Sequence, residues 1–149
     1  MRRLLILGVL SSGCLLPESP RRYAVWERST EGAQVLADCA EVDAWVSKSG
    51  KEGVGVTLEL RGRSTAPCVV TIASAKLRVG ADEVAAKALP EPPTLRLGQR
   101  VHAYLAFSFD GDRAWNAGLE GALILGAPQT TVTFPLRQTM PKREDCEPR

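Results

Sequence analysis

The sequence predicts an all-β domain, an antiparallel sandwich of about seven strands, and three observations support this prediction. Apolar residues alternate with polar ones along several short stretches, as in strands with one buried and one solvated face. Glycine- and proline-rich turn signals separate these stretches at intervals of about ten residues. The chain has 149 residues, so removal of the first 13 would leave 136, enough for one domain with a core.

The first half of the domain contains the clearest alternation. Residues 54–60 alternate valine and leucine with polar residues and glycine, and residues 41–46 form a strand before them. The stretch 47–53 supplies the glycines of a hairpin between these two strands. A third strand is expected over 69–72, followed by another over 76–79.

The second half is less regular. Residues 81–94 could form a helical turn or a short strand, and three prolines end whichever element forms. The next strand would place five apolar residues on one face: Val101, Ala103, Leu105, Phe107 and Phe109. A turn at 110–112, a helical turn at 114–119 and strands at 123–125 and 131–136 complete the domain.

The N-terminus has the pattern of an export signal. Arg2 and Arg3 precede a seven-residue apolar stretch, and small residues follow it before Cys14. The apolar stretch is much shorter than the roughly 20 residues of a spanning helix. Residues 1–13 are therefore expected to be a cleaved signal peptide, 14–33 a tether and 139–149 a polar tail.

The cleavage region resembles the lipobox of bacterial lipoproteins in Leu10-Ser11-Ser12-Gly13-Cys14, although Ser11 stands where that motif has an aliphatic residue. The resemblance implies lipid on Cys14 and, with Leu15 following, transport to the outer membrane. Several acyl chains would hold the protein there essentially permanently. Ordinary signal peptidase, which recognises small residues such as Ser11 and Gly13, would cut the same bond.

The order of strands over residues 34–138 resembles immunoglobulin-like modules of bacterial envelope proteins. The resemblance is carried most by Leu97-Gly98, which leads into a strand ending Phe107-Ser108-Phe109. It implies an immunoglobulin-like β-sandwich and points to no specific family.

The four cysteines bear on both the anchor and the fold. If Cys14 carries lipid, Cys39, Cys68 and Cys146 remain for one disulfide. Cys39 precedes the first strand and Cys68 follows the second, so a hairpin brings them to the same end, and they are the preferred pair. Cys146 is the rival partner of either cysteine. A loop of about 30 residues closed in this way stabilises by roughly 3–4 kcal/mol.

Charge argues against nucleic acid as a partner. Loss of Arg2 and Arg3 takes the 19 basic residues to 17, which equals the 17 acidic residues. The sequence shows no run of lysine and arginine interleaved with aromatic residues.

Motifs for catalysis or metal binding are weak. His102 is the only histidine, and its phase in the strand predicts a surface position. The stretch 110–121 fails the calcium-loop pattern at its fifth, sixth and twelfth positions. Glu41, Asp43 and Glu59 could meet across strands as paired carboxylates, but solvated charge on polar strand faces is the simpler interpretation. No metal or cofactor is expected.

The two tryptophans of the predicted domain have different expected roles. Trp115 lies in a loop and could anchor a partner, or else cover the open end of the core. Trp45 lies in a strand and is expected in the core or in a cross-strand contact.

These observations predict a non-catalytic envelope lipoprotein, anchored by lipid on Cys14 at the periplasmic face or the surface of the outer membrane. Its expected role is to bind an envelope protein partner or to act as a structural accessory, through sheet edges or loops. A glycan- or peptidoglycan-binding module is an alternative; it would require two or more exposed aromatic residues on one surface, which only three tryptophans and two tyrosines make difficult. A carboxylate-based hydrolase is a second alternative and would require a deep cleft.

Overall fold

The computed structural model describes residues 25–27, 32–50, 53–108 and 120–139. In these ranges the chain forms eleven strands, and none of the described residues lies in a helix. The expected all-β class is confirmed. The strand count is larger than the seven expected because of four additional short strands: β1 (Val25–Glu27), β2 (Gln34–Ala37), β7 (Asp82–Ala85) and β8 (Thr94–Leu95).

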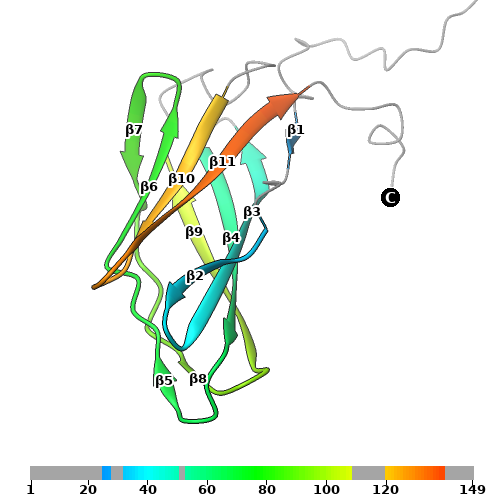
Figure 1. Cartoon of the computed structure of the whole chain (residues 1–149). Coiled ribbons are helices and arrows are strands. Elements are labelled where there is room, and N and C mark those ends of the chain that lie inside the picture. Colours follow the sequence, from blue (N-terminus) through cyan, green and yellow to red (C-terminus); the bar gives the residue numbers. More distant parts are fainter. Residues whose placement is uncertain (1–24, 28–31, 51–52, 109–119, 140–149) are drawn as a thin grey trace, which may run out of the picture.

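Two antiparallel sheets face one another (Figure 1). The five-stranded sheet has the order β1-β11-β10-β6-β7, comprising Val25–Glu27, Thr131–Thr139, Glu120–Gly126, Ser74–Val79 and Asp82–Ala85. The four-stranded sheet has the order β2-β3-β4-β9, comprising Gln34–Ala37, Ala40–Gly50, Gly53–Gly62 and Arg100–Phe107. A small third sheet pairs β5 (Cys68–Val69) with β8 (Thr94–Leu95).

Alternate residues of both main sheets build one core. β4 contributes Val54, Val56, Leu58 and Leu60, each at most 3% exposed. The five-stranded sheet contributes fully buried side chains that include Leu77, Leu123, Leu125 and Phe134. Burial of each such side chain stabilises the fold by about 1.5–3 kcal/mol. The alternation that predicted the strands is therefore the pattern that packs the two sheets together.

Both open sides of the sandwich are crossed by hydrogen bonds. On one side, the Gln34 Nε2 of β2 donates to the Thr133 carbonyl of β11 over 2.7 Å. On the other, the chain leaves β7, and the Lys87 N–H donates over 2.8 Å to the Ala106 carbonyl at the free edge of β9. These bonds tie the edges of the two sheets to each other.

Cys39 and Cys68 form a disulfide with their Cα atoms 6.2 Å apart. The bond joins the turn between β2 and β3 to the beginning of β5. The preferred pairing of the sequence analysis is therefore present in the structure.

The expected third strand is wrong in its extent. The ladder pairing stops at Val69 and resumes at Ser74, although Val70 and Ile72 are buried. The Val70 N–H donates instead to the Pro93 carbonyl, outside either main sheet. Burial of every second residue produced a strand-like pattern in a segment that only connects β5 to β6.

Two other segments are clarified by the structure. The ambiguous stretch 81–94 contains a strand, β7, and no helical turn. β1 lies within residues 14–33, which were expected to be a tether, and it pairs with β11. The expected helical turn at 114–119, together with Phe109 and the 110–112 turn, lies outside the described residues.

Candidate functional site

The outer face of the four-stranded sheet collects polar, charged and aromatic side chains. On β3, β4 and β9 every second side chain points into the core, so the others point away from it. We call nine of these outward-pointing residues the outer face: Glu41, Asp43, Trp45, Thr57, Glu59, Arg61, Arg100, His102 and Tyr104.

Strand register arranges the outer face in three rows, each crossing from β3 through β4 to β9. The first row is Trp45, Thr57 and Tyr104. The second is Asp43, Glu59 and His102, and the third is Glu41, Arg61 and Arg100. Directly opposed Cβ atoms lie about 4.5–5.5 Å apart, so side chains within a row can interact.

The Trp45 ring packs edge-on against the His102 ring. The two ring centroids are 6.1 Å apart and the ring planes are 82° apart. Trp45 is half-buried, and this contact spans from β3 to β9 over the intervening β4. The expected cross-strand role of Trp45 is therefore the one that the structure has.

The Tyr104 ring lies over Gly55. A Cβ atom at Gly55 would overlap the hydroxyl end of the Tyr104 side chain. Tyr104 nevertheless remains 53% exposed. Glycine at this position leaves room over β4 for the hydroxyl end of the Tyr104 ring, and the ring remains exposed.

Arg61 is bonded to two carboxylates at the centre of the third row. Its Nη1 donates to Glu41 Oε1 and its Nη2 to Glu59 Oε1, each over 3.1 Å. The Nε atom of Arg61 is buried and has no hydrogen-bond acceptor among the described residues. The guanidinium is thus held in place by its two terminal nitrogens.

Glu59 is the shared acid of the outer face. His102 Nε2 lies 3.2 Å from Glu59 Oε2, and Arg100 Nη1 lies 3.8 Å from Glu59 Oε1. The hydrogen bond from His102 is the largest of the effects that lower the pKa of Glu59 below its ordinary value of 4.5. Burial opposes it, and Arg61 and Arg100 lower the pKa further. Glu59 is therefore ionised at neutral pH and orients the basic groups around it.

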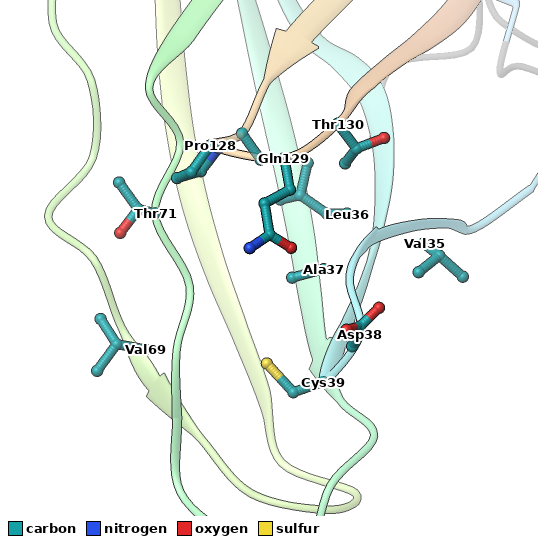
Figure 2. A pocket seen from close by; sticks show the side chains of 11 residues that line it. Val35, Leu36, Ala37, Asp38, Cys39, Val69, Thr71, Pro128, Gln129 and Thr130 are labelled. Atoms are coloured by element: carbon teal, nitrogen blue, oxygen red, sulfur yellow. The ribbon is translucent and has the colours of Figure 1, made fainter.

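A groove of about 550 Å³ lies apart from the outer face, along the edge of β2. Figure 2 shows the Gln129 side chain reaching into its middle, with the Cys39 sulfur at its lower end. Three stretches line it: residues 35–39, Val69 with Thr71, and the 127–130 turn. The lining includes one carboxylate, Asp38, and no histidine or lysine.

The described part of the chain contains no cluster of three or more metal-ligating side chains. None of its segments forms a helix with the length and apolarity needed to cross a membrane.

The structure describes only some of the residues that the sequence singled out. Cys14, Trp115 and Cys146 lie outside the described residues. Among the described ones, Cys39 and Cys68 pair with each other, and His102 is exposed, as its strand phase predicted.

Arg61 links two of the three carboxylates that the sequence singled out. Glu41 and Glu59 both bond to Arg61, and Asp43 is the register partner of Glu59. Asp43 also accepts a hydrogen bond from the Ala44 N–H over 2.8 Å. The carboxylates thus lie on an open sheet face.

Tyr104 and the arginines of the outer face were missed by the sequence analysis. Arg61 lies on β4, and Arg100 and Tyr104 lie on β9, about 40 residues later in the chain. No local motif therefore links Arg61 to the other two residues. The one available signal was their shared phase with His102 on β9 and with Glu59 on β4.

Comparison of the chain with protein-family models, with curated proteins and with solved structures finds no match.

Proposed function

We propose that this chain is a non-catalytic binding module that recruits a protein partner through its outer face. One observation carries the proposal: Trp45, Tyr104, Arg61 and Arg100 share a single sheet face. Tryptophan, tyrosine and arginine are the residue types most enriched among those that dominate binding energy in protein interfaces. The sheet edges and Trp115, which lies outside the described residues, stay the contacts predicted from the sequence, and the outer face is the contact surface proposed from the structure.

The proposed setting is the bacterial cell envelope. The signal-like residues 1–13 and the lipobox-like sequence ending at Cys14 support export and lipid attachment. The Cys39–Cys68 disulfide supports an oxidising compartment, because such bonds persist mainly outside the cytosol. The intact mass of the mature protein tests the anchor, since acyl chains on Cys14 would add their mass to that of residues 14–149.

We also propose that the sandwich is immunoglobulin-like. Its seven main strands divide into three, β3-β4-β9, facing four, β11-β10-β6-β7. Seven-stranded immunoglobulin-like domains divide their strands between two facing sheets in the same numbers. Successive main strands that change sheets, such as β4 to β6 and β7 to β9, add to this support.

The state of the carboxylates supports a binding role over hydrolysis. A glycosidase requires a general acid whose pKa is raised, so that it holds a proton at working pH. The pKa of Glu59 is shifted the other way, and both Glu59 and Glu41 are ion-paired with Arg61.

Mild-detergent capture of the anchored protein from the envelope tests the proposed partner. Wild-type protein should retain a defined envelope protein, and Tyr104→Ala should lose it. Thr133→Ala, an exposed position on the other sheet, is the matched control and should retain it. Recovery of no partner, or equal recovery by the two variants, would contradict the proposal.

Glycan binding is a second candidate, favoured by one specific observation. Trp45, which is half-buried, and Tyr104, which is exposed, occupy the same row of one face, and aromatic rings on one surface are a feature of sugar-binding modules. Sedimentation with peptidoglycan tests it: wild-type protein would pellet with the glycan, and Tyr104→Ala would stay in solution. Failure of wild-type protein to pellet would exclude this candidate.

A further inference from the structure

Four arginines gather where β4 ends and β9 begins; we call Arg61, Arg63, Arg96 and Arg100 the arginine cluster. Arg61 and Arg100 are direct register partners. The Arg63 N–H donates to the Cys39 carbonyl over 2.8 Å, which continues the β3–β4 ladder beyond Gly62. Because strand side chains alternate, Arg63 continues the line of Arg61 on the outer face.

Arg96 joins the cluster through the turn that precedes β9. A Cβ atom at Gly62 would overlap the Arg96 carbonyl, so this backbone packs directly against the end of β4. The Gly98 N–H donates to the Gly62 carbonyl over 3.0 Å, and the Leu97 N–H donates to the Ser64 carbonyl over 2.6 Å. These bonds fix the turn beside Arg63.

Most of the donors of the arginine cluster are free within the described residues. Glu41 and Glu59 both bond to Arg61. The side chains of Arg63, Arg96 and Arg100 hydrogen-bond to no other described residue, and Arg100 only approaches Glu59 at 3.8 Å. Arg63 and Arg96 are exposed, and the Arg100 side chain is 58% exposed. The cluster therefore presents a local excess of positive charge on a chain whose total charge is close to balanced.

We propose that the arginine cluster docks an acidic, carboxylate-rich segment of the partner protein. This inference rests on the proposed function and specifies the chemistry of the partner. Each free guanidinium offers a planar fork of N–H donors that matches a carboxylate in a bidentate manner. Tyr104 lies two rows above Arg100 on the same strand, so a segment held by the arginines can also pack on the aromatic row.

The composition of the cluster favours a protein over an anionic lipid surface. All four residues of the cluster are arginines, and the row two rows away on the same sheet face supplies a tryptophan and a tyrosine. This combination is enriched in protein interfaces, whereas attraction to a lipid surface depends on the number of positive charges near it. Phosphate groups also fit arginine forks, so a lipid arm belongs in the test.

The experiment uses the mature protein with a short fluorescent polyglutamate peptide, measured by anisotropy at low salt. Arg63→Glu and Arg100→Glu should each weaken binding by about tenfold, the worth of one charge-assisted hydrogen bond. Arg137→Glu is the matched control, since Arg137 is exposed on the outer side of β11, and it should bind like wild type. Binding should also weaken as salt increases.

Three results would overturn the inference. These are absence of polyglutamate binding at low salt, an equal loss in the Arg137→Glu control, and binding to phosphatidylglycerol vesicles without binding to the peptide. A captured partner that is retained equally by wild type and the Arg63→Glu/Arg100→Glu protein would also overturn it while leaving the proposed function intact. The proposed function fails by a different result: wild-type protein captures no protein partner, or the Tyr104→Ala protein captures it as well as wild type does.

Discussion

The end of the Tyr104 ring lies over Gly55. Gly55 is two residues before Thr57, which is the register partner of Tyr104 on β4. Gly55 is buried beneath this ring, and no side chain of its own separates the two. The close approach of the Tyr104 side chain to β4 therefore depends on the absence of a Cβ atom at Gly55.

Gly55→Ala should displace the Tyr104 ring with little effect on stability. The overlap involves the far end of a side chain that can rotate away, so the free energy of unfolding should fall by less than about 1 kcal/mol. The ring resonances of Tyr104 in NMR spectra should shift, and capture of the partner should weaken. Unchanged Tyr104 resonances would show that the ring does not rest on Gly55.

Gly53→Ala should destabilise the protein much more, by about 3 kcal/mol. Gly53 has a φ angle of 141°, and an added Cβ would overlap the Phe107 carbonyl on β9, where backbone cannot easily move. Gly98→Ala is the control, with a φ of 77° but open space around it, and should lose about 1 kcal/mol. Urea denaturation measures both, and equal losses would contradict the steric account.

Local signals were sufficient to predict the fold class. The alternation of Val54 to Leu60 identified β4 correctly because burial on one face follows directly from a period of two. The cysteine pair was also predictable, since one hairpin brings Cys39 and Cys68 to the same end.

The candidate site was not predictable in the same way. Trp45 and Tyr104 meet in one row only because β9 returns to pair with β4 after 37 intervening residues that form parts of both other sheets. Likewise, the turn that contains Arg96 lies beside the end of β4 only because its backbone packs against Gly62. Such placements depend on the pairing of strands that are far apart in the sequence. The overall charge of the chain, which is nearly balanced, gives no sign of the local group of arginines.

Replacing both Cys39 and Cys68 by serine should lower the free energy of unfolding by about 3–4 kcal/mol in the chain-entropy account. The bond closes a loop with a sequence separation of 29. Denaturation in urea, with oxidised wild type as the reference, measures the loss. Stability equal to that of wild type would show that the bond contributes little to the folded protein.

Stability should fall in acid, partly through Glu59. Its pKa is lower in the folded protein than its ordinary value of 4.5, so its contribution is present above 4.5 and is lost as the pH falls through the folded pKa. Glu59→Gln should show a shallower decrease in the free energy of unfolding below pH 4.5 than wild type.

Glu83 contributes separately to the acid sensitivity, because hydrogen bonds from Lys76 and Arg78 lower its pKa on the opposite sheet. Glu83→Gln is therefore the comparison that separates the two carboxylates. If the Glu59→Gln protein and wild type lose stability in parallel below pH 4.5, the ion pairs of Glu59 do not stabilise the fold.

The central claim is that a protein partner contacts the outer face. Its most direct test is a photo-crosslinking residue in place of Tyr104, irradiated in the cells that make the protein, with position 137 as the control. The account predicts a defined protein adduct from position 104, absent from position 137 and weakened by Arg63→Glu with Arg100→Glu. No adduct from position 104, or the same adduct from both positions, would contradict it.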